Sequence, residues 1–183
     1  MLRLRALVPA GEKASAEEAI CGRLAGEARR RGAKSIAVYI AVREELDLSR
    51  FIRAAQPLPS RPVFAAPRWD GSRYRLARLE CTGGGIDAST LATGPMGIPE
   101  PRADAPEIPP GEIDFWVVPG LAFAPDGARL GYGGGWYDRL LAEAADDAPV
   151  FAPAYAFQIL PSLPAEETDA CRVSAVAAQA GAC

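Results

Sequence analysis

The chain has 183 residues, of which 49% are hydrophobic, and a formal net charge of -3. This length suits one domain over residues 1–183 with a substantial core. The slight negative charge argues against general nucleic-acid binding. No apolar run approaches the roughly 20 residues that a membrane span needs. We therefore expect a cytoplasmic protein, a monomer or weak homodimer, that binds neither nucleic acid nor a membrane.

The sequence contains no histidine. This excludes Ser-His-Asp and Cys-His catalysis and every imidazole base. Cys21, Cys81, Cys171 and Cys183 are scattered without a CxxC pair, so neither a zinc site nor a disulfide framework is indicated. Any catalysis must therefore use carboxylates, Arg, Lys, Tyr, backbone dipoles or a hard cation. Phosphoryl transfer is compatible with this set, because it depends mainly on positioning and on charge neutralisation by Mg²⁺, Arg and N–H groups.

A first long helix is indicated near the N-terminus. Ser15 and Glu18 form a capping-box pattern that predicts its start. The basic residues 29–31 followed by Gly32 predict its end, because cations favour a helix C-terminus and glycine favours the position just beyond.

Apolar runs that end at turn residues predict the remaining elements. A short helix is expected over residues 48–55, and strands over residues 35–40, 61–66, 74–79, 114–118, 149–159 and 172–178. Residues 82–110 are rich in Gly, Pro and Thr and predict a long functional loop. Strands alternating with helices indicate an α/β fold with a largely parallel sheet.

The densest motif is PGLAFAPDGARLGYGGGWYDR at residues 119–139. Its glycines, at 131 and 133–135, permit positive φ and let backbone N–H groups approach an anion. A helix expected over residues 136–145 would place them near a helix N-terminus, which favours phosphate. Arg129 and Arg139 flank the glycines and could add charge-assisted contacts. The glycine spacing by itself leaves a turn without a ligand equally open.

Read with PGLAF before it and GPMGIPEP at residues 94–101, RLGYGGGWYDR resembles the signature of the 5-formyltetrahydrofolate cyclo-ligase (methenyltetrahydrofolate synthetase) family. The likeness continues through YIAVREELDLSRFI at residues 39–52 and AFQILPSLPAEETD at residues 156–169. It implies a Rossmann-like three-layer α/β/α sandwich of the ribose-5-phosphate isomerase and CoA-transferase type. It also implies conversion of 5-formyltetrahydrofolate to 5,10-methenyltetrahydrofolate, with ATP as co-substrate and Mg²⁺ as cofactor.

The same resemblance assigns roles residue by residue. Arg129 and Tyr137 would be catalytic, and Asp138 and Asp169 would hold Mg²⁺. ATP would contact Arg129, Leu130, Gly131, Tyr132, Gly133, Gly134, Gly135, Trp136 and Tyr137, and the folate would contact Ile40, Glu45, Tyr132, Gly133, Gly134, Gly135 and Trp136. Structural roles stay open beside these: Asp138 as a first-turn helix residue, Glu45 as a solvated loop charge and Asp169 as a turn former.

Several positions depart from the family pattern. Family members carry a Lys and an Arg in an N-terminal helix, and these two side chains reach the triphosphate. When the family pattern is aligned with this sequence, both positions fall before Met1, so Arg3 and Arg5 are the nearest substitutes. Ala124 stands for an Asp, Thr168 for a His, and Ala178-Gln179 for Thr-Glu. The alternative is therefore a paralogue without this activity, which binds folate or nucleotide or acts on another substrate.

Overall fold

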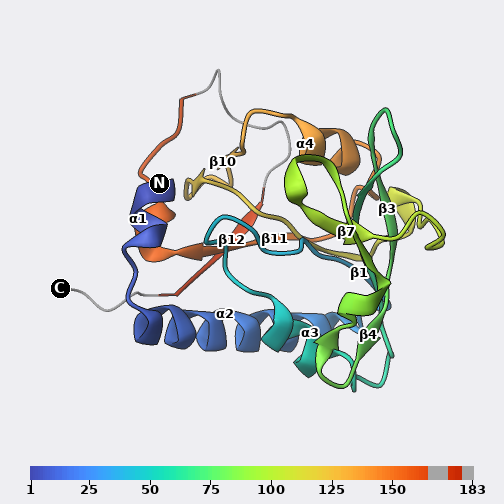
Figure 1. Cartoon of the computed structure of the whole chain (residues 1–183). Coiled ribbons are helices and arrows are strands. Elements are labelled where there is room, and N and C mark those ends of the chain that lie inside the picture. Colours follow the sequence, from blue (N-terminus) through green and yellow to red (C-terminus); the bar gives the residue numbers. More distant parts are fainter. Residues whose placement is uncertain (165–172, 179–183) are drawn as a thin grey trace.

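A six-stranded sheet forms the centre of the computed structural model, which describes residues 1–164 and 173–178 (Figure 1). All neighbouring strands are parallel except β2 and β3, which pair antiparallel from Phe64↔Leu79 to Trp69↔Tyr74. In spatial order the strands are β12 (Ser174–Ala178), β11 (Val150–Tyr155), β8 (Phe115–Val117), β1 (Ser35–Ala37), β2 (Val63–Trp69) and β3 (Tyr74–Leu79).

Helices cover both faces of this sheet. On one face α2 (Ala10–Arg31) and α3 (Ser49–Ala55) lie along the strands, and α4 (Trp136–Leu141) lies on the other (Figure 1). Successive side chains of β8 point to opposite faces of the sheet, as in any strand. Phe115 packs in the core beneath α2 and α3, and Trp116 packs in the core on the α4 side. The predicted three-layer α/β/α sandwich with a largely parallel sheet is confirmed.

The two ends of α2 can be compared with the helix start and end that the sequence predicts. Gly32 closes the helix in the left-handed conformation at φ 64°, as predicted. The predicted start was wrong, because α2 begins at Ala10 after Pro9, and the Ser15 hydroxyl donates to the Gly11 carbonyl inside the helix at 3.0 Å. A five-residue helix that was not predicted, α1 (Leu2–Ala6), precedes it.

Residues 82–110, predicted as a loop, contain short paired strands. β4 (Cys81–Thr82) pairs with β5 (Gly85–Ile86), and β6 (Leu91–Thr93) pairs with β7 (Pro99–Pro101). The buried carboxylate of Glu100 accepts a hydrogen bond from the Trp69 backbone at 3.1 Å, which fixes β7 against β2. Single 3-10 turns occur at η1 (Ala88–Thr90), η2 (Pro95–Gly97), η3 (Pro110–Glu112) and η4 (Ala156–Gln158).

A second hairpin leads into the glycine-rich motif. After β8, the antiparallel pair β9 (Ala122–Phe123) and β10 (Arg129–Leu130) delivers the chain to residues 131–135, here called the glycine loop. The helix that follows, α4, ends at Leu141 and is shorter than the predicted 136–145. Within the described ranges, no helix combines the length and apolar character needed to cross a membrane.

Candidate functional site

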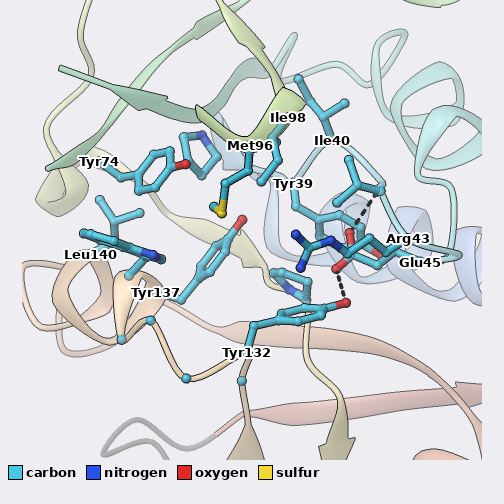
Figure 2. A pocket seen from close by; sticks show the side chains of 18 of the residues that line it. Tyr39, Ile40, Arg43, Glu45, Tyr74, Met96, Ile98, Tyr132, Tyr137 and Leu140 are labelled. Carbon is cyan, nitrogen blue, oxygen red and sulfur yellow. Dashed lines mark hydrogen bonds between the residues drawn. The ribbon is translucent and has the colours of Figure 1, made fainter. Parts of the chain in front are cut away.

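A pocket of about 310 Å³ opens between the glycine loop, the turn that follows β1 and the β6–β7 hairpin (Figure 2). Most predicted site residues line it: Ile40, Glu45, Arg129, Gly131, Tyr132, Gly133, Gly134, Gly135, Trp136, Tyr137 and Asp138. Leu130 lies beside them in β10, and Asp169 falls outside the described residues. The structure thus brings together two sets of residues that are far apart in the sequence.

The glycine loop depends on its glycines for two reasons. Gly133 and Gly135 adopt φ angles of 83° and 60°, which side chains with a Cβ rarely tolerate. At Gly134 a Cβ would lie 2.6 Å from Cδ1 of Trp136, so the backbone packs directly against the indole. Gly133 and Gly134 are exposed, which leaves loop backbone accessible to an anion.

Arg129 lies buried beneath the loop, only 2% exposed. Its guanidinium donates to the Pro119 carbonyl at 3.1 Å and to Oδ1 of Asp138 at 3.2 Å, and it lies 5.8 Å from the ring centroid of Tyr137. These contacts tie the end of β8 to the first turn of α4. They also place a permanent positive charge at the pocket wall.

Arg139 braces the loop from its other side. Its Nη2 donates to the Gly134 carbonyl at 2.8 Å, and its guanidinium stacks 4.3 Å from the Trp136 ring centroid. The sequence predicted that Arg139, beside the glycines, could add charge-assisted contacts to an anion. In the structure its contacts shape the loop.

An aromatic cluster closes one end of the pocket. Trp136 meets Trp69 and Tyr74 edge to face at 5.3 Å between centroids, and Trp69 meets Tyr74 at 5.2 Å. Met96 and Ile98 of the β6–β7 hairpin also line the pocket, and the Met96 side chain extends towards Tyr137 (Figure 2). Such a surface suits a flat, partly apolar ring.

Glu45 occupies the opposite wall and is 7% exposed. Its Oε1 accepts from the Tyr132 hydroxyl at 2.8 Å and its Oε2 from the Val42 backbone at 3.0 Å. Burial raises the pKa of Glu45, while these two hydrogen bonds and the charges of Arg5 and Arg43 oppose the increase. Glu45 is therefore not a solvated loop charge but a buried carboxylate in the pocket wall.

The pocket tyrosines remain protonated at neutral pH. Burial, aided by the charge of Glu45, raises the pKa of Tyr137 far above its ordinary value and that of Tyr132 to about 12. The Tyr137 hydroxyl points into the pocket towards Met96 (Figure 2). Tyr137 is thus available as a neutral hydrogen-bond donor.

Sequence reasoning missed three residues of this site: Arg43, Tyr74 and Met96. It named Arg5 only as a nearest substitute for a triphosphate-binding cation, whereas the structure buries Arg5 against Tyr132 and Gly120. Arg43 lies within YIAVREELDLSRFI and Met96 within GPMGIPEP, two of the motifs that carry the family resemblance. Their place in these motifs was the available signal. Both have left-handed backbones, with φ angles of 50° and 59°, a strain that clusters at functional sites. Arg5 carried no local signal for its contacts with Tyr132 and Gly120, which are distant in the sequence.

Of the two predicted Mg²⁺ ligands, Asp138 is the one that lies among the residues that the structure describes. The described parts of the chain contain no group of three or more His, Cys, Asp or Glu side chains that could hold a metal ion. A single carboxylate beside the glycine loop still fits Mg²⁺, because this ion is usually held by one or two carboxylates together with substrate phosphates.

The sequence model of the 5-formyltetrahydrofolate cyclo-ligase family matches residues 1–178. The chain belongs to this family. A cyclo-ligase from Mycolicibacterium smegmatis is 31% identical over 172 residues, which cover 92% of this chain and 85% of that protein. One from Haemophilus influenzae is 27% identical over 171 residues, covering 91% and 88%.

Solved structures of cyclo-ligase family members share the fold. The 5,10-methenyltetrahydrofolate synthetase of Aquifex aeolicus aligns with a TM-score of 0.79 at 27% identity, covering 96% of this chain and 84% of that one. The synthetase of Mycoplasma pneumoniae aligns with a TM-score of 0.71 at 19% identity, covering 95% and 91%, which supports the fold alone. The resemblance that the motifs indicated is confirmed over nearly the whole chain.

Proposed function

We propose that this chain is a 5-formyltetrahydrofolate cyclo-ligase, which converts 5-formyltetrahydrofolate and ATP to 5,10-methenyltetrahydrofolate, ADP and phosphate. The observation that carries the proposal is one pocket in which a glycine loop over a buried arginine faces a buried carboxylate. The pocket lies within a chain that matches the family model from residue 1 to residue 178.

The polyphosphate of ATP binds along the glycine loop and the residues on either side of it, over residues 129–137. Exposed loop backbone and the guanidinium of Arg129 supply the donors and the charge that phosphate oxygens require. Mg²⁺, when bound with ATP, neutralises charge on the phosphate oxygens. We assign Asp138 and Asp169 as its protein ligands, the first supported by its place at the pocket wall.

The folate binds across the same pocket. Glu45 and Ile40 contact the pterin, since a carboxylate pairs with the N–H groups of that ring. The aromatic ring that follows the pterin lies against Trp136 and Tyr74, where the structure offers edges and faces for stacking. This places the formyl group near Tyr132 and the loop.

The reaction then needs no protein nucleophile. The formyl oxygen attacks the γ-phosphorus, the bond to ADP breaks and ADP leaves. N10 next attacks the formyl carbon and loses its proton, and phosphate departs with the former formyl oxygen. The protein aligns the reactants and stabilises developing charge, which agrees with a chain that contains no histidine.

We also infer that the enzyme works in the cytoplasm as a monomer or weak homodimer, with small-molecule partners only. The absence of a spanning helix from the described residues and the scattered thiols support this setting. Size-exclusion chromatography with light scattering at two protein concentrations measures the oligomeric state.

The direct test is to incubate the protein with ATP, Mg²⁺ and 5-formyltetrahydrofolate and to follow the absorbance of the methenyl product. Product that needs all three components supports the proposal. Ligand-induced thermal stabilisation without ADP release, at high enzyme concentration, would instead favour a binding protein.

A further inference from the structure

We propose that Arg5 and Tyr132 are positioning residues, which together hold the Glu45 carboxylate in place and fasten it to the glycine loop. They act through a chain of hydrogen bonds from Arg5 to Tyr132 to Glu45. The inference rests on the proposed function only in taking Glu45 as a folate contact.

The direction of this chain is fixed by chemistry. Nη1 of Arg5 donates to the Tyr132 hydroxyl at 2.8 Å, and that hydroxyl lies 2.8 Å from Oε1 of Glu45. Arginine can only donate, so the hydroxyl oxygen of Tyr132 accepts from Arg5 and its hydrogen is committed to Glu45. Figure 2 shows the Tyr132 hydroxyl directed at the carboxylate. These two hydrogen bonds therefore orient one oxygen of Glu45 and favour its ionised form, which opposes the effect of burial.

Arg5 is anchored at its other end to the sheet. Its Nη2 donates to the Gly120 carbonyl, just beyond β8, and the side chain is 4% exposed. The Gly120 carbonyl also accepts from Nε2 of Gln158 at 3.2 Å. Arg5 thus braces the interior of the site from α1, and its guanidinium is not among the groups that line the pocket.

The turn that carries Glu45 needs such support. Arg43 and Glu44 are consecutive residues with left-handed backbones, at φ angles of 50° and 62°. Conformations of this kind persist only where the surroundings impose them. Lys13 of α2 holds Glu44 at 2.8 Å on the outer side, and Tyr132 holds Glu45 on the pocket side.

The charged and titratable groups around Glu45 come from four segments: Arg5 of α1, Arg43 of the turn, Tyr39 after β1, and Tyr132 and Tyr137 around the glycine loop. The Tyr39 hydroxyl already donates to the Leu46 carbonyl at 2.7 Å. Tyr132 is thus the tyrosine whose hydroxyl bonds the carboxylate. Loss of that hydroxyl or of the Arg5 charge should raise the pKa of Glu45 further, because both favour the ionised form.

Tyr132→Phe is the sharpest variant, since it removes one hydroxyl and keeps the ring. The matched control is Tyr155→Phe, whose buried hydroxyl has no hydrogen-bond partner in the described structure. The pKa of Glu45 is read from ¹³C NMR titration of the ligand-free, glutamate-labelled protein, with Glu45→Gln assigning the resonance. We expect an increase of about one pH unit in Tyr132→Phe and none in Tyr155→Phe.

Arg5→Gln should raise the same pKa, and Arg5→Lys should restore part of the change by returning the charge. Circular dichroism shows whether each variant folds; if Arg5→Gln does not, Tyr132→Phe alone decides. In the assay, Tyr132→Phe should raise the KM for 5-formyltetrahydrofolate roughly tenfold and move the KM for ATP far less.

If the pKa of Glu45 is unchanged in a folded Tyr132→Phe variant, the inference is overturned, whatever the cyclo-ligase activity of that variant. A wild-type protein with no cyclo-ligase activity would overturn the proposed function and leave the NMR result standing. The two failures are therefore distinguishable.

Discussion

Nη2 of Arg129 donates to Oδ1 of Asp138 at 3.2 Å, so the buried cation and the carboxylate assigned to Mg²⁺ form one ion pair beneath the glycine loop. Arg129→Lys should lower turnover roughly 100-fold, because an ammonium cannot hold both the Pro119 carbonyl and Asp138 and still face phosphate charge. Steady-state kinetics at saturating ATP measures the effect.

Arg30→Lys, on the exposed end of α2, is the matched control and should leave turnover unchanged. If Arg129→Lys turned over at the wild-type rate, Arg129 would lose its assigned catalytic role. A lower melting temperature with unchanged turnover would assign Arg129 to structure alone.

Gly134→Ala tests the contact between the loop backbone and Trp136. The new Cβ would lie 2.6 Å from Cδ1 of the indole, so the ring must shift, and its edge-to-face contacts with Trp69 and Tyr74 are disturbed. We expect folate affinity to fall roughly tenfold, since the aromatic surface is disturbed. Isothermal calorimetry measures this, and unchanged affinity would remove the aromatic cluster from the folate site.

The control for that change is Gly22→Ala, in the middle of α2, where a Cβ meets nothing within 4 Å. Alanine should increase the free energy of unfolding there by about 0.5–1 kcal/mol and leave folate affinity unchanged. The pair separates the general effect of replacing glycine from the effect of crowding the loop.

The sequence predicted the features that depend on local patterns. Apolar runs located β8 and β3, Gly32 marked the end of α2, and the glycine run located one wall of the pocket. The motif around Glu45 located the opposite wall. These signals succeed because strand burial, left-handed caps and close backbone approach each restrict residue type at single positions.

Other features depend on contacts that local patterns do not encode. Ser15 and Glu18 match a capping box, yet the helix continues to Ala10, because alanine and glutamate upstream also tolerate helix and α2 packs on the sheet. Arg5 pairs with Tyr132 across 127 positions of sequence. No composition or period marks such a pair, so the support for Glu45 emerged only from the structure.

Cys21 and Cys81 should resist alkylation in the native protein. Burial raises the pKa of both thiols to about 11, so little reactive thiolate exists at neutral pH. Mass spectrometry after a brief iodoacetamide pulse should find both unmodified at pH 7.5 and modified after unfolding in guanidinium. Rapid native labelling of Cys21 would contradict its burial against α3.

Glu45→Gln should separate stability from function. Burial raises the folded-state pKa of Glu45 above its unfolded value, so folding favours the protonated form. The stabilisation from Glu45 is therefore complete below the ordinary carboxyl pKa and is lost as pH rises through the raised value. At pH values above the folded-state pKa of Glu45, the wild type carries a buried charge that the glutamine variant lacks. Glu45→Gln should therefore be more stable than the wild type at pH 7.5 but should bind folate poorly.

Urea denaturation at a series of pH values from 4 to 8 measures this difference. The advantage of Glu45→Gln in free energy of unfolding should be smallest at the acid end and grow with pH to a plateau. Glu80→Gln, an exposed carboxylate of a surface ion pair, serves as the control and should show no such growth. A wild type that is more stable than Glu45→Gln at pH 7.5 would mean that the Tyr132 and Val42 hydrogen bonds outweigh the desolvation of the carboxylate.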